Sequence, residues 1–178
     1  MVNSPIKNGA ILGVIMCIAA LAMAFIAPKP FVMYGRTALV LAVFYFMYKI
    51  GKDEKIRQEG SLDFGEAFKA IFIGSVVAYL IFTGFEFVLY NYIKPDLNIV
   101  AHEAALETAN SAMDWISGFA DADEEAMVRA KEEIANELTL DKVSKNVGNT
   151  LLGLMSNLIF PCLIGGLIMA LITKSKNA

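Results

Sequence analysis

The sequence has few of the side chains that most enzymes use for acid–base, metal or redox chemistry. Its 178 residues include one His, His102, and two Cys, Cys17 and Cys162. A single His with no second His or Cys nearby offers no zinc-ligand spacing, and we expect it to be a surface residue of a helix. Both cysteines fall in apolar segments, where a thiol behaves as a small apolar side chain. Too few cysteines lie elsewhere for a disulfide framework.

Common catalytic and nucleotide-binding patterns are also missing. The sequence contains no Gly-rich phosphate loop, no HExxH helix and no Ser or Cys nucleophile next to a base. The most polar connection between apolar segments, residues 49–69, carries five basic and five acidic residues. It therefore lacks the positive excess that nucleic acid attracts. We expect no enzyme activity, no cofactor, no metal and no nucleic-acid partner.

Long apolar runs are abundant. The chain is 57% hydrophobic and 19% charged, with a mean hydropathy of +0.56. A bilayer core about 30 Å thick needs about 20 apolar residues in a helix. Each apolar run is close to that length, and the runs are Gly9–Ala27, Phe31–Tyr48, Ala70–Ile93 and Leu151–Thr173. The sequence predicts an all-α, polytopic membrane protein with four transmembrane helices.

The first run could alternatively be read as a secretory signal, since Lys7 precedes it and Ala22-Met23-Ala24 resembles a cleavage site. The run continues to Ala27 and another apolar run follows directly, which favours a transmembrane helix.

Positive charges predict how the chain is oriented. Residues 1–93 should hold three transmembrane helices with a short cytoplasmic loop near 49–69, and residues 147–178 the fourth helix and a cytoplasmic tail. Eight Lys or Arg fall on the predicted face that carries both termini, against two, Lys29 and Arg36, in the opposite short turn. Both termini are therefore predicted to be cytoplasmic. The insert at 94–146 would be extracytoplasmic, and periplasmic in a Gram-negative cell.

Local signals predict helices around and within this insert. Asp63 and Glu66 have the spacing of a capping box at the start of the third span. Apolar residues recur at helical spacing over 96–117 and again over 121–138, where Asp121 and Glu124 form a second capping box. Since Gly118 separates the two stretches, the insert is predicted to be an acidic helical hairpin that packs on the membrane portion or on a partner.

Two charged residues within the predicted spans are the first candidates for function, because a charge in a bilayer is costly unless it is paired or hydrated. Arg36 and Glu86 are predicted to lie at similar depth. Three interpretations remain open: an ion pair that joins two helices, a Glu86 that exchanges a proton or cation in a polar cavity, or snorkelling to the interface.

The fourth run contributes a second candidate polar site, formed by Asn157 and Pro161. Pro161 should kink the helix, giving either a kinked packing seam or a broken helix that exposes carbonyls to a cation. Small residues at helical spacing let helices approach closely. The glycines that we predict to pack helices are Gly9, Gly13, Gly74, Gly153 and Gly165.

The segment Ser61-Leu62-Asp63-Phe64-Gly65-Glu66-Ala67-Phe68-Lys69 and the exit Ile93-Lys94-Pro95-Asp96 resemble the bacterial membrane family catalogued as domain of unknown function 4199. The resemblance covers nearly the whole chain. Here Lys94 replaces the usual apolar or aromatic residue, and Leu62-Asp63 enlarges the entry motif. The resemblance implies an inner-membrane protein of Bacteroidota and brings no activity, cofactor or catalytic residue.

The leading hypothesis is a non-catalytic inner-membrane protein that binds the bilayer and associates with itself or with another membrane protein through its acidic insert and small-residue faces. A small proton- or cation-coupled transporter or channel component, using Glu86 and Asn157, is the alternative. An enzyme acting on lipid is a third, weaker hypothesis.

Overall fold

The computed structural model describes residues 4–118 and 124–174, and within them the side chains at 36–37, 124 and 157–161 lie outside the description. The described part is helical and contains no strand, as the sequence predicted. Its elements are α1 (Pro5–Ile26), α2 (Pro28–Pro30), η1 (Phe31–Gly35), α3 (Arg36–Arg57), α4 (Phe64–Val88), η2 (Leu89–Ile93), α5 (Leu97–Ser117), α6 (Glu124–Glu137), α7 (Leu140–Val143), α8 (Val147–Asn157), η3 (Leu158–Gly165) and α9 (Gly166–Thr173).

Within residues 4–118 and 124–174, two helices are long and apolar enough to cross a bilayer: Pro5–Ile26 and Phe64–Ile93. The second predicted run lies in a pair of helices, Pro28–Gly35 and Ala38–Arg57, that would qualify as a third span if taken together but meet at a bend of 52°. The fourth run contains a shorter apolar helix, Cys162–Thr173. Length and composition thus support two spans and allow a third, where the sequence predicted four.

The junction between α3 and α4 is built from two well-defined helix ends. The backbone N–H of Gly60 donates to the carbonyl of Lys55 at 2.9 Å, and the backbone N–H of Glu59 donates to the carbonyl of Ile56 at 3.2 Å. Glu59 and Gly60 both have a positive φ. This is the Schellman pattern that closes a helix. Asp63 then caps α4, because its Oδ1 accepts from the backbone N–H of Glu66 at 2.9 Å. This bond confirms the part of the predicted capping box that Asp63 supplies. Because α3 continues to Arg57, the predicted loop near 49–69 is largely helical.

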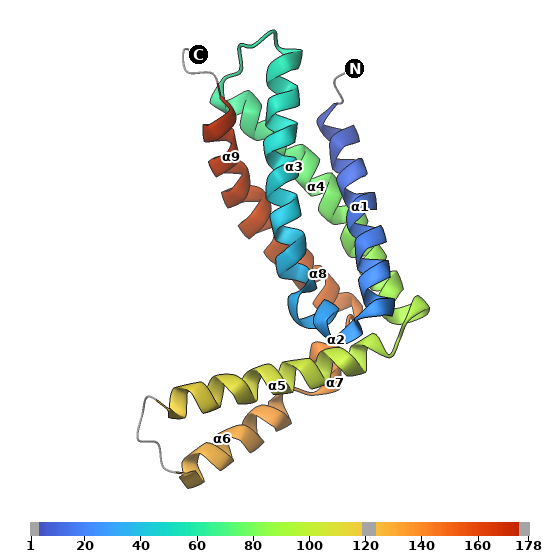
Figure 1. Ribbon diagram of the computed structural model, residues 1–178, viewed down its shortest axis with the longest axis vertical. Coiled ribbons are helices and arrows are strands. Elements are labelled where there is room, and N and C mark those ends of the chain that lie inside the picture. Colours follow the sequence, from blue (N-terminus) through green and yellow to red (C-terminus); the bar gives the residue numbers. More distant parts are fainter. Residues whose placement is uncertain (1–3, 119–123, 175–178) are drawn as a thin grey trace.

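The long helices pack side by side into a bundle with α4 at its centre (Figure 1). α1, α3 and α9 all pack on α4, and α9 also packs on α3. Both described ends of the chain and the α3–α4 junction lie at one end of this bundle, and the insert lies at the other. Large side chains of the core include Leu12 and Met16 of α1, Val43, Met47 and Ile50 of α3, and Ile71 of α4.

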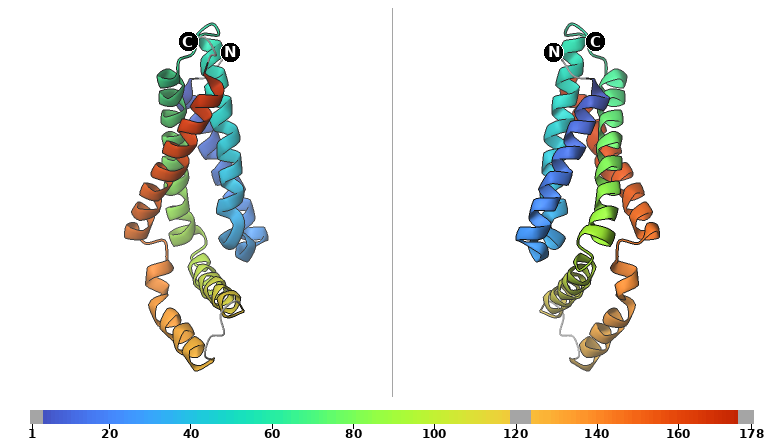
Figure 2. Two further views of the ribbon diagram at one scale, coloured as in Figure 1. Left: turned by 90° about the vertical axis from the view of Figure 1, so that its left-hand side faces the viewer. Right: turned by 90° about the vertical axis from the view of Figure 1, so that its right-hand side faces the viewer.

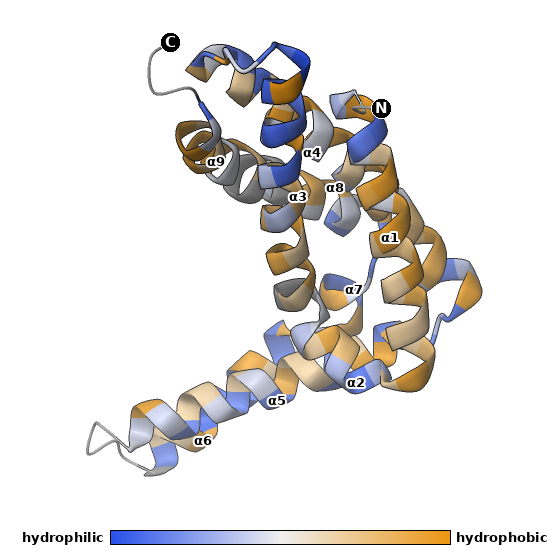
Figure 3. Ribbon diagram, turned by 45° about the horizontal axis from the view of Figure 1, so that its top comes forward, coloured by the Kyte–Doolittle hydropathy of each residue, from blue (hydrophilic) through white to orange (hydrophobic). Residues whose placement is uncertain are grey.

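The outer surface of the bundle is apolar rather than polar. In α1, for example, Val14, Ile18 and Ile26 are exposed while Leu12 and Met16 are buried. A helix that is apolar on all sides is typical of a protein core or a bilayer. Hydrophobic colouring covers the bundle helices, whereas the α3–α4 junction and parts of α5 and α6 are hydrophilic (Figure 3).

The insert forms a helical hairpin that projects from the bundle. Its first helix, α5 (Leu97–Ser117), agrees with the predicted range 96–117, and α6 (Glu124–Glu137) agrees with the predicted second helix; Asp121 lies outside the described residues. α5 packs on η1 and α2 of the bundle and on α6. α5 runs crosswise at the end of the bundle, and α6 lies on the side of α5 that faces away from it (Figures 1 and 2).

Candidate functional site

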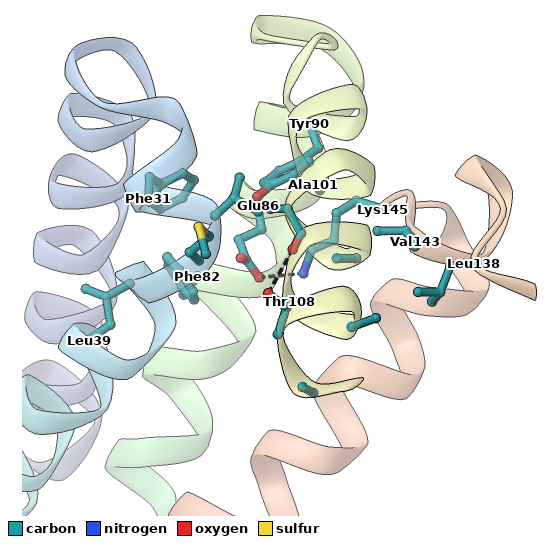
Figure 4. A pocket seen from close by; sticks show the side chains of 16 residues that line it. Phe31, Leu39, Phe82, Glu86, Tyr90, Ala101, Thr108, Leu138, Val143 and Lys145 are labelled. Atoms are coloured by element: carbon teal, nitrogen blue, oxygen red, sulfur yellow. Dashed lines mark hydrogen bonds and ion pairs between the residues drawn. The ribbon is translucent and has the colours of Figure 1, made fainter. Parts of the chain in front are cut away.

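A cavity of about 500 Å³ lies between the bundle and the insert. Phe31, Leu39 and Phe82 form its wall on the bundle side, and one face of α5, including Ala101 and Ala104, forms the opposite wall. Glu86 and Lys145 are the charged residues among those that line it (Figure 4). Among the side chains that the structure describes, the site is therefore a mostly apolar cavity with one pair of opposite charges.

Glu86 and Lys145 form a largely buried ion pair. Lys145 Nζ lies 3.3 Å from Glu86 Oε2, and the two side chains are 17% and 6% exposed. Lys145 Nζ also lies 5.7 Å from the centre of the Tyr90 ring, within the range of a cation–π contact. Since Glu86 belongs to α4 and Lys145 to the segment between α7 and α8, the pair joins the bundle to the end of the insert.

Two asparagines hold the backbone around the same pair. Asn91 Nδ2 donates to the carbonyl of Lys145 at 2.8 Å and to that of Phe87 at 2.8 Å. Asn98 Oδ1 accepts from the backbone N–H of Lys145 at 3.0 Å, and its Nδ2 donates to the carbonyl of Tyr90 at 2.9 Å. Asn98 lies near the start of the insert and Lys145 near its end. These bonds therefore hold both ends of the insert to the outer end of α4 and to η2.

His102 joins the two sides of the helical hairpin. His102 is partly buried, and its Nε2 lies 2.6 Å from the carbonyl oxygen of Leu138. His102 lies in a helix, as predicted, and its exposure is reduced because the chain after α6 folds back over α5. Among the described residues, no group of three or more His, Cys, Asp or Glu is placed to hold a metal ion. Cys162 is buried and Cys17 partly buried, both as free thiols.

The structure places part of the predicted site. Glu86 lies in the cavity wall, whereas the side chains of Arg36, Asn157 and Pro161 lie outside the described part of the chain. The predicted Arg36–Glu86 pair therefore stays a prediction. The backbone around Asn157 and Pro161 changes from α to π winding at Leu158.

The predicted packing glycines lie along several helix contacts. Gly9 of α1 lies against Gly74 of α4, so that a Cβ on Gly9 would collide with the Gly74 carbonyl oxygen. A Cβ on Gly13 would lie 2.9 Å from Ile81 Cβ, and one on Gly165 would lie 2.9 Å from Phe44. Gly153 lies in α8 and is partly buried.

Sequence reasoning missed Lys145 and a second polar group at the other end of the bundle. There, the buried Asn8 donates from Nδ2 to Asp53 Oδ2 at 2.9 Å. Glu54 is also buried, and its Oε1 accepts from Arg57 at 2.7 Å and from Gln58 at 3.1 Å. Glu54 follows Val43, Met47 and Ile50 at helical spacing on the buried face of α3, a signal that could have predicted its burial.

No curated protein and no solved structure matches the chain. A family model does match, over residues 7–175, and its description is "Protein of unknown function (DUF4199)". The match spans nearly the whole chain and includes the capped entry to α4, the insert and the final apolar segment. The chain belongs to the DUF4199 family.

Proposed function

We propose that this protein is a four-pass integral protein of a bacterial inner membrane, of the Bacteroidota type that the family resemblance implies. In this arrangement the second span is η1 and α3, and the fourth is α8, η3 and α9. The apolar exterior of the bundle and the excess of Lys and Arg at its termini end support it. Both termini are then cytoplasmic, and residues 94–146 lie in the periplasm.

The proposed role is non-catalytic: the insert presents a binding surface for another protein or for a second copy. One observation carries this role. No described side chain of α6 is buried, although the base of the insert is held to the bundle by the Glu86–Lys145 pair and by Asn91 and Asn98. An insert that is held firmly to the bundle and leaves α6 exposed is suited to binding a partner.

Charge indicates the kind of partner. The partly buried stripe of α6, which includes Met127, Ala130 and Ile134, faces the rest of the protein. Its exposed face carries Glu125, Arg129, Glu132, Glu133 and Glu137. Because opposite potentials attract across interfaces, the partner surface is proposed to be basic.

Photocrosslinking in intact cells tests this role. A photoreactive residue at Val128, on the exposed face of α6, should form one discrete adduct. The adduct mass distinguishes a second copy from another protein. The double variant Glu132→Lys with Glu133→Lys should remove the adduct, whereas Glu59→Lys, at the opposite end of the bundle, should keep it. Absence of a discrete adduct, or an adduct that survives charge reversal on α6, would contradict the role.

A transport role is the second candidate, and the position of Glu86 in the wall of a 500 Å³ cavity favours it. In that case Glu86 would exchange a proton or cation along a route that also includes Asn157. Glu86→Gln should then abolish proton- or cation-dependent flux in vesicles, while the exposed control Glu103→Gln keeps it. Equal flux in the two variants and the unmodified protein would remove this candidate.

A further inference from the structure

We infer that the distal half of α5 lies on the outer surface of the bilayer, with Trp115 and Ile116 inserted among the lipid headgroups. The inference rests on the four-span arrangement proposed above. It assigns a second surface to the insert, separate from the exposed face of α6.

Two contacts fix the level of α5 relative to the spans. Just before α5, Asp96 pairs with Lys94 at 3.0 Å, and the Lys94 ammonium lies 5.2 Å from the centre of the Phe25 ring near the end of α1. Further along, Glu107 pairs with Lys29 of α2 at 2.5 Å. Both contacts lie where apolar segments end, and they are about 16 Å apart along a helix. The axis of α5 is therefore held near the plane in which the spans leave the bilayer.

Beyond Glu107, α5 continues past the side of the bundle (Figure 1). In a membrane, the space beside the bundle at this level is filled by lipid headgroups. Trp115 lies about 12 Å beyond Glu107 along the helix, so it is positioned over lipid rather than over protein.

Helical spacing determines which way Trp115 and Ile116 face. They follow Thr108 and Ala109 by seven residues, and Thr108 and Ala109 line the cavity between α5 and the bundle. Seven residues make nearly two turns, so these side chains share one face. Trp115 and Ile116 are 68% and 51% exposed. The face of α5 that covers the bundle therefore continues beyond it as a large apolar surface directed toward the bilayer.

The chemistry of this face fits an interface between water and lipid. Trp has an apolar ring with one polar N–H and is enriched at the headgroup level of membrane proteins. On another side of the same turn, Asp114 pairs with Lys131 of α6 at 2.6 Å. Charge is thus directed to the water-facing hairpin and apolar area to the bilayer, the pattern of an interfacial helix.

Because Trp115 is the one Trp of the chain, its fluorescence reports on this contact directly. The full chain is reconstituted into phosphatidylcholine vesicles whose acyl chains carry bromine close to the headgroups, and into matched vesicles without bromine. An interfacial side chain lies about 5–10 Å into the bilayer boundary, so bromine should quench Trp115 emission strongly.

Two variants in a Trp115→Phe background serve as controls. Val128→Trp, on the exposed face of α6, should not be quenched. Leu41→Trp, on the exposed surface of α3, should be quenched because the span itself contacts lipid.

Each outcome separates the inference from the four-span proposal. An unquenched Trp115 with a quenched Leu41→Trp overturns the inference and leaves the span intact. An unquenched Leu41→Trp overturns the span assignment. Equal quenching of Trp115 and Val128→Trp overturns the assignment to one face of the hairpin. Trp115 emission that depends on the protein-to-lipid ratio, without quenching, would assign the surface to a second copy instead and overturn the bilayer contact.

Discussion

The two ends of the bundle are closed in different ways. At the termini end, Gly9 and Gly74 bring α1 and α4 into backbone contact, and Gly51 of α3 lies against Thr173 of α9. Toward the insert, the α1–α3 side and the α4–α8 side diverge (Figure 2), leaving the cavity that contains Glu86. Small residues close one end directly, whereas the other end needs an insert, a buried ion pair and two asparagines. At the diverging end, contacts between the bundle and the insert therefore stabilise both.

The largest effect is expected from breaking the ion pair at the diverging end. Lys145→Met leaves Glu86 buried without this partner, and removal of one member of a buried pair costs about 3 kcal/mol or more. Replacing both residues, Lys145→Met with Glu86→Leu, should cost less than the single change because no charge is stranded. Unfolding by SDS in mixed micelles measures the free energies. If the free energy of unfolding lost in the double variant equals the sum of the losses in the two single variants, the residues are not coupled.

The glycine contact at the closed end is expected to be nearly as sensitive. A Cβ on Gly9 meets the carbonyl oxygen of Gly74, and backbone cannot move away as a side chain can. Gly9→Ala should therefore cost about 2 kcal/mol through overpacking. Gly84 is the matched control, because a Cβ there meets nothing within 4 Å, so Gly84→Ala should stabilise the helix by about 0.5–1 kcal/mol. Equal effects at the two positions, measured in the same micelles, would refute the close contact.

The smallest effect is expected at the exposed pair between α2 and α5. The hydrogen bond from Lys29 to Glu107, followed by the negative charge of Glu107, raises the pKa of Lys29 above its usual 10.5. A raised pKa means that the stabilising contribution is present below about pH 10.5 and is lost as the pH rises through the folded-state value. In the same mixed micelles, Lys29→Met should therefore unfold at a slightly lower SDS fraction than the unmodified protein at neutral pH. The two proteins should unfold at the same SDS fraction at high pH, and salt should reduce the difference seen at neutral pH. A difference that persists at high pH would contradict this origin.

Local signals predicted the helices better than they predicted the site. The capping residue Asp63 and the periodic apolar residues of 96–117 act within a few turns of helix, so their consequences could be read from the sequence. The partner of Glu86 could not, because Lys145 is 59 residues away and reaches it only after the whole insert has folded back. The contact between His102 and Leu138 could not be predicted for the same reason, since it forms across the hairpin. The bend in the second apolar run was not indicated by composition, which does not register changes in helix direction.

In the proposed topology, the two ends of the bundle face opposite sides of a membrane. In a Cys17→Ala, Cys162→Ala background, single cysteines at Lys7, Glu59, Val128 and Lys174 can be tested with a membrane-impermeant maleimide on spheroplasts. We expect Val128→Cys to be labelled before lysis and the other three cysteines to be labelled only after it. Labelling of Val128→Cys and Glu59→Cys from the same side would contradict it.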